Sequence, residues 1–245
     1  MARYKLVVEY HGCPFVGWQR QKNGVSVQQV IEEAIFKFSG ENVITQVAGR
    51  TDAGVHATGQ VCHFDLTKDT DVFTVCDAIN FHVKPNPVSV LSAELVDDEF
   101  HARFSATKRL YLYRITNRRA PLAIEKGLSW QVPQQLNTQA MSTAAKILIG
   151  HHDFTTFRAV GCQANSPIKT LDHLSVEKDK EMVLVSAQAR SFLYHQVRNI
   201  VGTLKLVGVE KWSVEDVTEA LAAKDRSRGG PTAPACGLYL TKVVY

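Results

Sequence analysis

The sequence predicts an α+β protein whose two halves repeat one order of elements, and three observations support this prediction. The chain has 245 residues, of which 45% are hydrophobic and 21% charged, a composition typical of folded globular proteins. No Pro/Ser-rich or low-complexity segment interrupts it. Strand and helix patterns follow the order β-α-β-β-α-β in the first half, and the second half can be read in the same way. We therefore expect two ferredoxin-like halves, residues 1–105 and 106–245, with antiparallel sheets that flank a central cleft; one mixed sheet without duplication is the alternative.

The elements of the first half are predicted from hydrophobic periodicity. A strand over 4–10 begins the half, because polar and apolar side chains alternate there. A helix over 27–38 follows, with apolar positions on one face, Ser26 as its N-cap and Gly40 as its C-terminal stop. The remaining elements are strands over 44–48 and 60–66, a helix over 72–81 and an alternating strand over 88–95.

The second half begins with an alternating strand over 109–116, followed by a helix over 138–149. Two strands come next and are joined by a turn at 178–181. A helix over 193–207 then presents an apolar face that includes Val197 and Leu204. The other predicted elements are the strands over 168–177 and 182–189, a short helix over 214–223 and a last strand over 237–244.

Motifs for cofactors and metals are missing from the sequence. It contains neither G-x-x-x-x-G-K-[ST] nor a G-x-G-x-x-G that follows a strand. Its five cysteines are scattered without a C-x-x-C pair, which predicts reduced thiols rather than disulfides or a zinc ribbon. The densest ligand-like cluster is His151-His152-Asp153, expected on a loop after Gly150 and without the i, i+4 spacing of a helical metal site. We therefore expect no metal and no small-molecule cofactor.

The hydropathy pattern argues against a membrane protein. Apolar stretches such as 200–209 are interrupted by Gly202 and Lys205 and are shorter than the roughly 18 residues of a membrane span. Glu9 stands where a signal peptide would still be apolar, so we interpret the N-terminus as a strand and the protein as cytoplasmic. The formal net charge of +4 permits an acidic partner without requiring one.

The first candidate site is the segment 48–60, in which glycines mark a tight and irregular backbone path. Asp52 and Arg50 lie two residues apart within it. An aspartate held on a rigid loop at a strand end is a common catalytic arrangement. The structural alternative is an Asp-Ala-Gly turn with a solvated Arg50.

The second candidate is the basic segment, residues 100–124, which holds six Lys and Arg residues and no acidic residue. Phe100, Phe104, Tyr111 and Tyr113 are interleaved with these charges. Cations neutralise phosphates and aromatic rings stack on unpaired bases, so the pattern is typical of nucleic-acid binding. A basic edge strand with core tyrosines explains it equally well. The six cations are Arg103, Lys108, Arg109, Arg114, Arg118 and Arg119.

The third candidate is a stripe on the helix over 193–207, separate from its apolar face. Arg198 lies at the centre of the stripe, and Gly202 would let another segment approach the helix backbone closely. A solvated amphipathic face explains the stripe just as well. Its members are Ser191, Tyr194, Arg198, Gly202 and Lys205.

Five segments of the chain match one known family in order. The segment Gly49-Arg50-Thr51-Asp52-Ala53-Gly54-Val55-His56 closely resembles the active-site motif of the tRNA pseudouridine synthase A family. The other matching segments lie at 10–21, 100–113, 197–202 and 235–240, so the resemblance covers nearly the whole chain. Gln196 departs from the family pattern, in which a methionine is expected.

The resemblance implies an isomerase that converts uridine to pseudouridine at positions 38, 39 and 40 in the anticodon stem-loop of tRNA. It also implies a homodimer without cofactor or metal, whose active site lies in the central cleft. Asp52 corresponds to the nucleophile, which stabilises or bonds the sugar carbon while the uracil is detached. Arg198 is the candidate partner of that carboxylate. Tyr111 corresponds to the active-site tyrosine, either as a stacking platform or as the base for the C5 proton.

Contacts with RNA are expected from five further residues. The target base must be flipped out of the stem, and Arg50 is the candidate to fill the vacated space or to hold the flanking phosphate. Arg20, His56, Lys108 and Arg109 are the other expected contacts, although His56 is equally suited to packing the loop. A non-catalytic RNA-binding module and a hydrolase of small glycosides are the alternatives. The carboxylate on a glycine-lined loop argues against the first, and the basic segment argues against the second.

Overall fold

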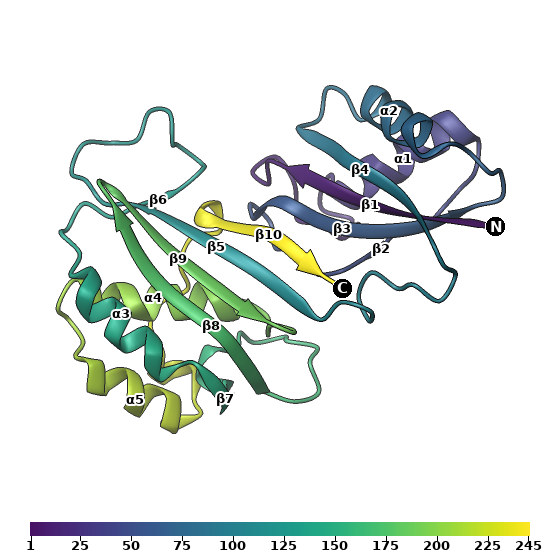
Figure 1. Ribbon diagram of the computed structural model, residues 1–245. Helices are drawn as coiled ribbons and strands as arrows, with labels where there is room; N and C mark the ends of the chain where they lie inside the picture. The colour runs from purple at the N-terminus through teal and green to yellow at the C-terminus, as the bar shows by residue number, and fades with distance from the viewer. The chain divides into compact units, whose positions relative to one another are not determined.

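The computed structural model describes residues 1–245 and shows a mixed α/β protein with five α-helices, consistent with the α+β class expected from the sequence (Figure 1). The chain divides into two compact units. Unit 1 comprises Met1–Thr107 and Tyr239–Tyr245, and unit 2 comprises Lys108–Leu238. None of the helices has the length and apolar character needed to cross a membrane.

In unit 1 the sheet has the strand order β4-β1-β3-β10. Strand β1 pairs antiparallel with both β3 and β4, β2 pairs antiparallel with β3, and β10 pairs parallel with β3. The elements are β1 (Ala2–Tyr10), α1 (Val27–Ser39), β2 (Gln46–Val47), β3 (His56–Leu66), α2 (Val72–His82), β4 (Val88–Val96) and β10 (Leu238–Val244).

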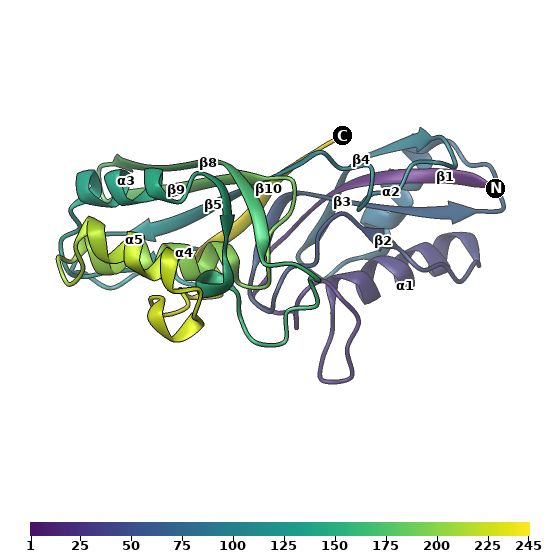
Figure 2. The same ribbon diagram turned by 90° about the horizontal axis from the view of Figure 1, so that it is seen from below.

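The core of unit 1 lies between this sheet and its two helices. Alternate side chains of β1 are buried, namely Tyr4, Leu6, Val8 and Tyr10. Helices α1 and α2 contact each other, and the two views show them along one face of the sheet (Figures 1 and 2). The predicted ends of α1 are confirmed, because the Ser26 side chain accepts from the Gln29 amide and Gly40 adopts φ +77°.

In unit 2 the sheet has the antiparallel strand order β5-β9-β8-β7, and β6 pairs parallel with β5. Helices α3, α4 and α5 lie together in this unit, with α3 in contact with both of the others (Figure 1). The elements are β5 (Lys108–Thr116), β6 (Trp130–Gln131), α3 (Thr138–Ile147), β7 (Gly150–Asp153), η1 (Thr155–Phe157), β8 (Ile168–Asp179), β9 (Met182–Ala189), α4 (Gln196–Gly208), α5 (Val214–Ala223), η2 (Arg226–Arg228) and η3 (Ala235–Gly237).

Two local predictions in this unit differ from the structure. The expected loop at 151–153 is the edge strand β7, which pairs with β8, and its side chains serve local contacts. His151 Nδ1 lies 3.0 Å from Thr170 Oγ1, and Asp153 accepts from the Thr155 amide. Helix α4 begins at Gln196 rather than at 193, because the preceding His195 has φ +59° and cannot continue a helix.

The last strand of the chain belongs to unit 1. Residues 237–244 were predicted to form the last strand of the second half, at the end of a repeated β-α-β-β-α-β order. In the structure β10 pairs with β3, so that Tyr239 lies opposite His56. These residues are far apart in the sequence, and a strand's periodicity identifies its buried face without identifying its neighbour.

Candidate active site

Residues 48–55 of unit 1 form a loop that leads directly into β3, and residues 56–60 of the predicted segment are the first residues of that strand. Asp52 forms an isolated antiparallel bridge with Gly17, and the Trp18 amide donates to the Thr51 carbonyl at 3.1 Å. The Val55 amide donates back to the Asp52 carbonyl at 3.1 Å, which closes a turn that contains Gly54 at φ +78°. The backbone on both sides of Asp52 is therefore fixed by hydrogen bonds, and its side chain is half-buried.

Buried side chains hold this loop through hydrogen bonds. The Tyr10 hydroxyl lies 2.7 Å from Thr51 Oγ1, and Gln60 Nε2 donates to the Gly49 carbonyl at 2.8 Å. Burial raises the pKa of Tyr10 to about 12, so its hydroxyl keeps its proton at neutral pH. Thr51 and Gln60 are buried, whereas Arg50 is exposed. Arg50 and Asp52 therefore lie on a loop whose neighbouring residues are held by buried hydrogen bonds.

His56 packs the end of this loop. It is 1% exposed, and its Nδ1 accepts from the Gly12 amide at 3.0 Å. Its ring stacks on Tyr239 with centroids 4.6 Å apart and meets His11 edge-on at 4.8 Å. A Cβ on Gly12 would collide with the Val55 carbonyl, so only glycine fits there. Of the two roles considered for His56, the contacts favour packing.

A group of possible metal ligands, not noticed in the sequence, lies beside this loop. The ligand atoms of His11, Cys13 and His56 lie within 4.8 Å of one another. Since His56 Nδ1 accepts from the Gly12 amide, the neutral ring carries its proton on Nε2 and has no lone pair there for a metal. Partial desolvation raises the pKa of the Cys13 thiol and so disfavours the thiolate that metals bind. The hydrogen bonding of this group favours packing over metal binding.

In unit 2, strand β5 carries two tyrosines with different surroundings. Tyr113 is fully buried, and its hydroxyl donates to the Pro234 carbonyl at 2.7 Å. Burial raises the pKa of Tyr113, which keeps the hydroxyl protonated. Tyr111 is half-buried and meets Phe192 edge-on, with ring centroids 5.1 Å apart. Tyr113 therefore belongs to the core, and Phe192 is a neighbour of Tyr111 that the sequence analysis did not identify.

Arg198 extends from α4 and is held by a following segment of the same unit. Its Nε donates to the Ala233 carbonyl at 2.8 Å, and the Ala233 amide donates to the Arg198 carbonyl at 3.1 Å. A Cβ on Gly202 would collide with the Pro231 carbonyl. The expectation that Gly202 admits a close backbone approach is confirmed, and the segment that approaches it is the one that holds Arg198.

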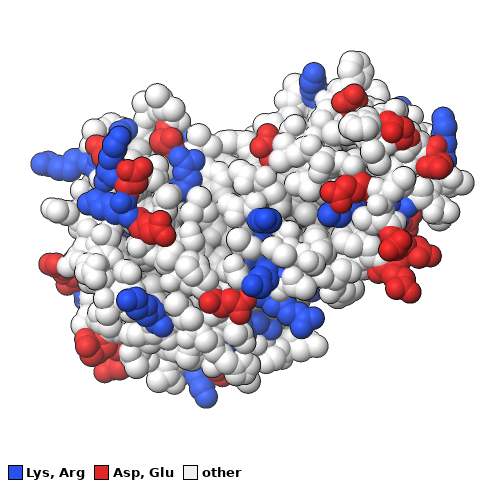
Figure 3. Space-filling view, viewed as in Figure 1, with Lys and Arg blue, Asp and Glu red and all other residues white.

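Several cations of the basic segment have partners that the sequence analysis did not anticipate. Arg114 forms a 2.8 Å ion pair with Glu125. Arg118 pairs with Glu181 at 3.1 Å. Both acids lie outside residues 100–124, and in the folded protein they neutralise part of the positive charge of the basic segment. Figure 3 accordingly shows Lys and Arg side chains beside Asp and Glu side chains on the face in view.

The remaining predicted RNA contacts also differ in exposure. Lys108 is exposed at the start of β5. Arg109 is 7% exposed, and its guanidinium donates to the Arg190 carbonyl within unit 2. Arg20 of unit 1 forms a 3.1 Å ion pair with Glu32. Exposure therefore favours Lys108 over Arg109 as a phosphate contact.

The predicted residues are thus distributed over both units. Unit 1 holds Arg20, Arg50, Asp52 and His56; Arg50 and Asp52 share one loop, and His56 follows it as the first residue of β3. Unit 2 holds Lys108, Arg109, Tyr111 and Arg198.

Comparison with known proteins gives a consistent match over the whole chain. The sequence model of the family described as tRNA pseudouridine synthase matches residues 6–105 and 144–245, which include Asp52 and Arg198. A protein of Paramagnetospirillum magneticum named tRNA pseudouridine synthase A is 60% identical over 245 residues, which is 100% of this chain and 96% of that protein. Proteins of the same name from Rhodospirillum centenum and Maricaulis maris are 58% and 56% identical over 100% of this chain and over 100% and 98% of their own lengths.

Proposed function

Because the chain belongs to the tRNA pseudouridine synthase family and is thereby an isomerase of uridine in tRNA, we propose that it acts at positions 38, 39 and 40 of the anticodon stem-loop, with Asp52 as its nucleophile. The observation that carries this proposal is the loop at 48–55. It holds a half-buried carboxylate on a backbone that is anchored on both sides of Asp52. Such preorganisation is what a covalent or electrostatic partner for a reacting sugar carbon requires.

The reaction exchanges one bond at the sugar and moves one proton. The bond between the sugar carbon C1′ and uracil N1 breaks, and the uracil leaves as a delocalised anion. The Asp52 carboxylate stabilises the positive charge that develops at C1′ or forms an ester with it, as carboxylates do in retaining glycosidases. The uracil then turns and bonds to C1′ through C5, and where an ester has formed its bond between C1′ and the Asp52 oxygen breaks, which frees the carboxylate. The C5 proton is lost and N1 gains one, so the elemental composition of the substrate is unchanged.

Tyr111 and Arg198 are proposed to serve the same reaction from unit 2. The half-buried ring of Tyr111 is proposed to stack on uracil, whereas Tyr113 is buried in the core with its hydroxyl bound to the Pro234 carbonyl. A Tyr111→Phe variant distinguishes stacking, which phenylalanine retains, from removal of the C5 proton, which it does not. The pairing of Arg198 with Asp52 remains a prediction. This prediction is supported by the hydrogen bond from Arg198 Nε to the Ala233 carbonyl, which fixes the orientation of the guanidinium.

The finer features of the assembly rest on the family resemblance. We propose that Arg50 assists flipping of the target base, since it is exposed on the nucleophile loop. We also propose a cytoplasmic homodimer with two ferredoxin-like halves. The order β1-α1-β2-β3-α2-β4 in unit 1 supports the last point. An RNA contact of Arg109 remains a prediction.

Mapping of pseudouridine in an unmodified tRNA tests the proposed function. Wild-type protein is expected to form product at positions 38 to 40, and Asp52→Ala is expected to form none while still binding tRNA. Binding of tRNA by the wild type without product would favour the alternative, a non-catalytic RNA-binding module. Product formed by Asp52→Ala at the wild-type rate would show that another group serves as the nucleophile.

A further inference from the structure

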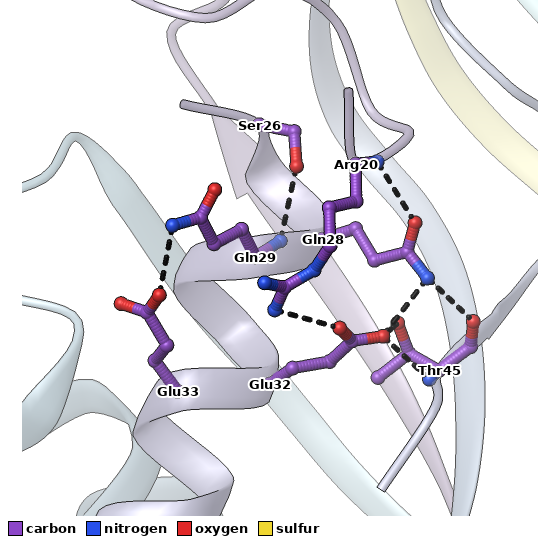
Figure 4. A network of polar contacts seen from close by, with 7 residues as sticks. All are labelled: Arg20, Ser26, Gln28, Gln29, Glu32, Glu33 and Thr45. Atoms are coloured by element: carbon purple, nitrogen blue, oxygen red, sulfur yellow. Dashed lines mark hydrogen bonds and ion pairs between the residues drawn. The ribbon is translucent and has the colours of Figure 1, made fainter. Parts of the chain in front are cut away.

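Glu32 of α1 connects three segments of unit 1 through one carboxylate (Figure 4). Its Oε1 accepts from Gln28 Nε2 at 2.8 Å and from the Thr45 amide and hydroxyl at 2.9 and 3.2 Å. Its Oε2 accepts from the Arg20 guanidinium at 3.1 Å. Glu32 is buried, and a buried carboxylate is costly unless it is paired and hydrogen-bonded. Arg20 supplies the charge that this carboxylate requires.

The segment that carries Arg20 is also bound to the first turn of α1. The Val27 amide donates to the Gly17 carbonyl at 3.2 Å, and the Gln28 amide donates to the Trp18 carbonyl at 2.9 Å. These amides belong to the first turn of the helix, where no earlier helical carbonyl is available to them. The Arg20 amide in turn donates to Gln28 Oε1 at 3.1 Å. Residues 17–20 are therefore attached to α1 by both backbone and side-chain contacts.

The other edge of this segment contacts the nucleophile loop. Gly17 bridges Asp52, and the Trp18 amide donates to the Thr51 carbonyl. Gly17 has φ +109°, and a Cβ there would lie 2.6 Å from the Thr51 carbonyl oxygen. A displacement of residues 17–20 away from α1 would therefore move the backbone that holds Asp52.

We infer that Glu32 and Arg20 are positioning residues for Asp52 and that Arg20 acts through this ion pair rather than through RNA. The inference rests on the proposed role of Asp52. It differs from the sequence-based expectation that Arg20 contacts tRNA. Loss of the Arg20 charge leaves the buried Glu32 carboxylate without its cation and removes the side-chain contact of Arg20 with α1. Residues 17–20 are then held to α1 by the backbone contacts and Gln28 alone. Small displacements of a reacting group lower the rate without weakening remote substrate binding.

The test measures single-turnover rates at saturating tRNA, the Kd for tRNA and its salt dependence. Arg20→Met is expected to lower the rate about tenfold or more, because a misplacement of about 1 Å costs up to a hundredfold. The Kd and its salt slope are expected to stay within about twofold of the wild type, because no phosphate contact is lost. Adding Glu32→Gln to Arg20→Met removes the unpaired charge and is expected to restore part of the rate. Glu33→Gln is the matched control, since Glu33 is exposed on the same helix and pairs only locally with Gln29.

Two results would overturn the inference. One is a raised Kd with a reduced salt slope and an unchanged rate in Arg20→Met, which identifies a phosphate contact. The other is a rate equal to that of Glu33→Gln. If Arg20→Met does not fold, Arg20→Gln takes its place with the same expected results, because it removes the charge but keeps a hydrogen-bond donor for Glu32. An active wild type with an inactive Asp52→Ala variant shows that the proposed function holds, so either overturning result then concerns Arg20 and Glu32 alone.

Discussion

Substitution of Gly17 by alanine tests how closely the segment before α1 is fitted to the nucleophile loop. Gly17 has φ +109°, a conformation that alanine adopts only with strain of about 1–3 kcal/mol. The added Cβ would also lie 2.6 Å from the Thr51 carbonyl oxygen and 3.1 Å from the Asp52 carbonyl carbon. Neither atom belongs to a flexible side chain, so the backbone must move, at an overpacking cost of about 1–3 kcal/mol. The expected loss in the free energy of unfolding is therefore about 2–6 kcal/mol.

Gly40→Ala is the matched control for the backbone term. Gly40 has φ +77° at the end of α1, and a Cβ there would meet nothing within 4 Å. It is expected to lose only about 1–2 kcal/mol, from the left-handed conformation alone.

Urea denaturation of both variants measures the two free energies, and single-turnover modification of tRNA measures the effect on Asp52. Gly17→Ala is expected to lose more stability than Gly40→Ala and to react at least about tenfold more slowly, whereas Gly40→Ala keeps the wild-type rate. Equal denaturation midpoints and equal rates for the two variants would refute the argument that Gly17 is closely fitted to the loop.

Two further predictions concern stability within each unit. The pKa of His63 is lowered to about 4, mainly by burial and also by the nearby His101 and Arg3. The folded protein therefore keeps this ring neutral, whereas the unfolded chain binds a proton below about pH 6.5. The free energy of unfolding is therefore expected to fall between pH 6.5 and pH 4, by about 2 kcal/mol at pH 5. In urea denaturation, His63→Gln is expected to make the free energy of unfolding depend less on pH over this range. An unchanged pH dependence would contradict its assignment to His63. Tyr113→Phe removes the hydrogen bond to Pro234 and is expected to lower the midpoint of thermal unfolding, at a cost of about 1 kcal/mol, while an unshifted midpoint would show that this bond contributes nothing.

The local features of the fold were predictable because short-range physical chemistry determines them. Alternation of side chains marked β1 and β5, and helical periodicity marked α1 and α5. Ser26 and Gly40 identified the ends of α1, since an N-cap hydroxyl and a left-handed C-terminal glycine satisfy the helix's own backbone. Prediction from local sequence patterns was less accurate where an element depends on a contact with a distant segment. Strand β7 was expected to be a loop because its pairing with β8 has no local signal.

The candidate site shows the same division. Its loop was found because Arg50 and Asp52 occur within a glycine-marked segment, a pattern that lies within a few residues. The partners of its cations were not found, because charges that are distant in sequence pair only when the chain folds. Arg118 and Glu181 are 63 residues apart, and their ion pair neutralises a positive charge that was expected from the sequence to face RNA.

By itself, therefore, the sequence determined the α+β class, most helices and strands, and the family with its aspartate motif. The tertiary structure alone decided that β10 pairs with β3, that Tyr113 is a core residue while Tyr111 is half-buried, and which acids neutralise which cations. The reason is that periodicity and capping act over one or two turns of chain. Strand neighbours, buried hydroxyl partners and ion pairs depend on which distant segments the folded chain brings together.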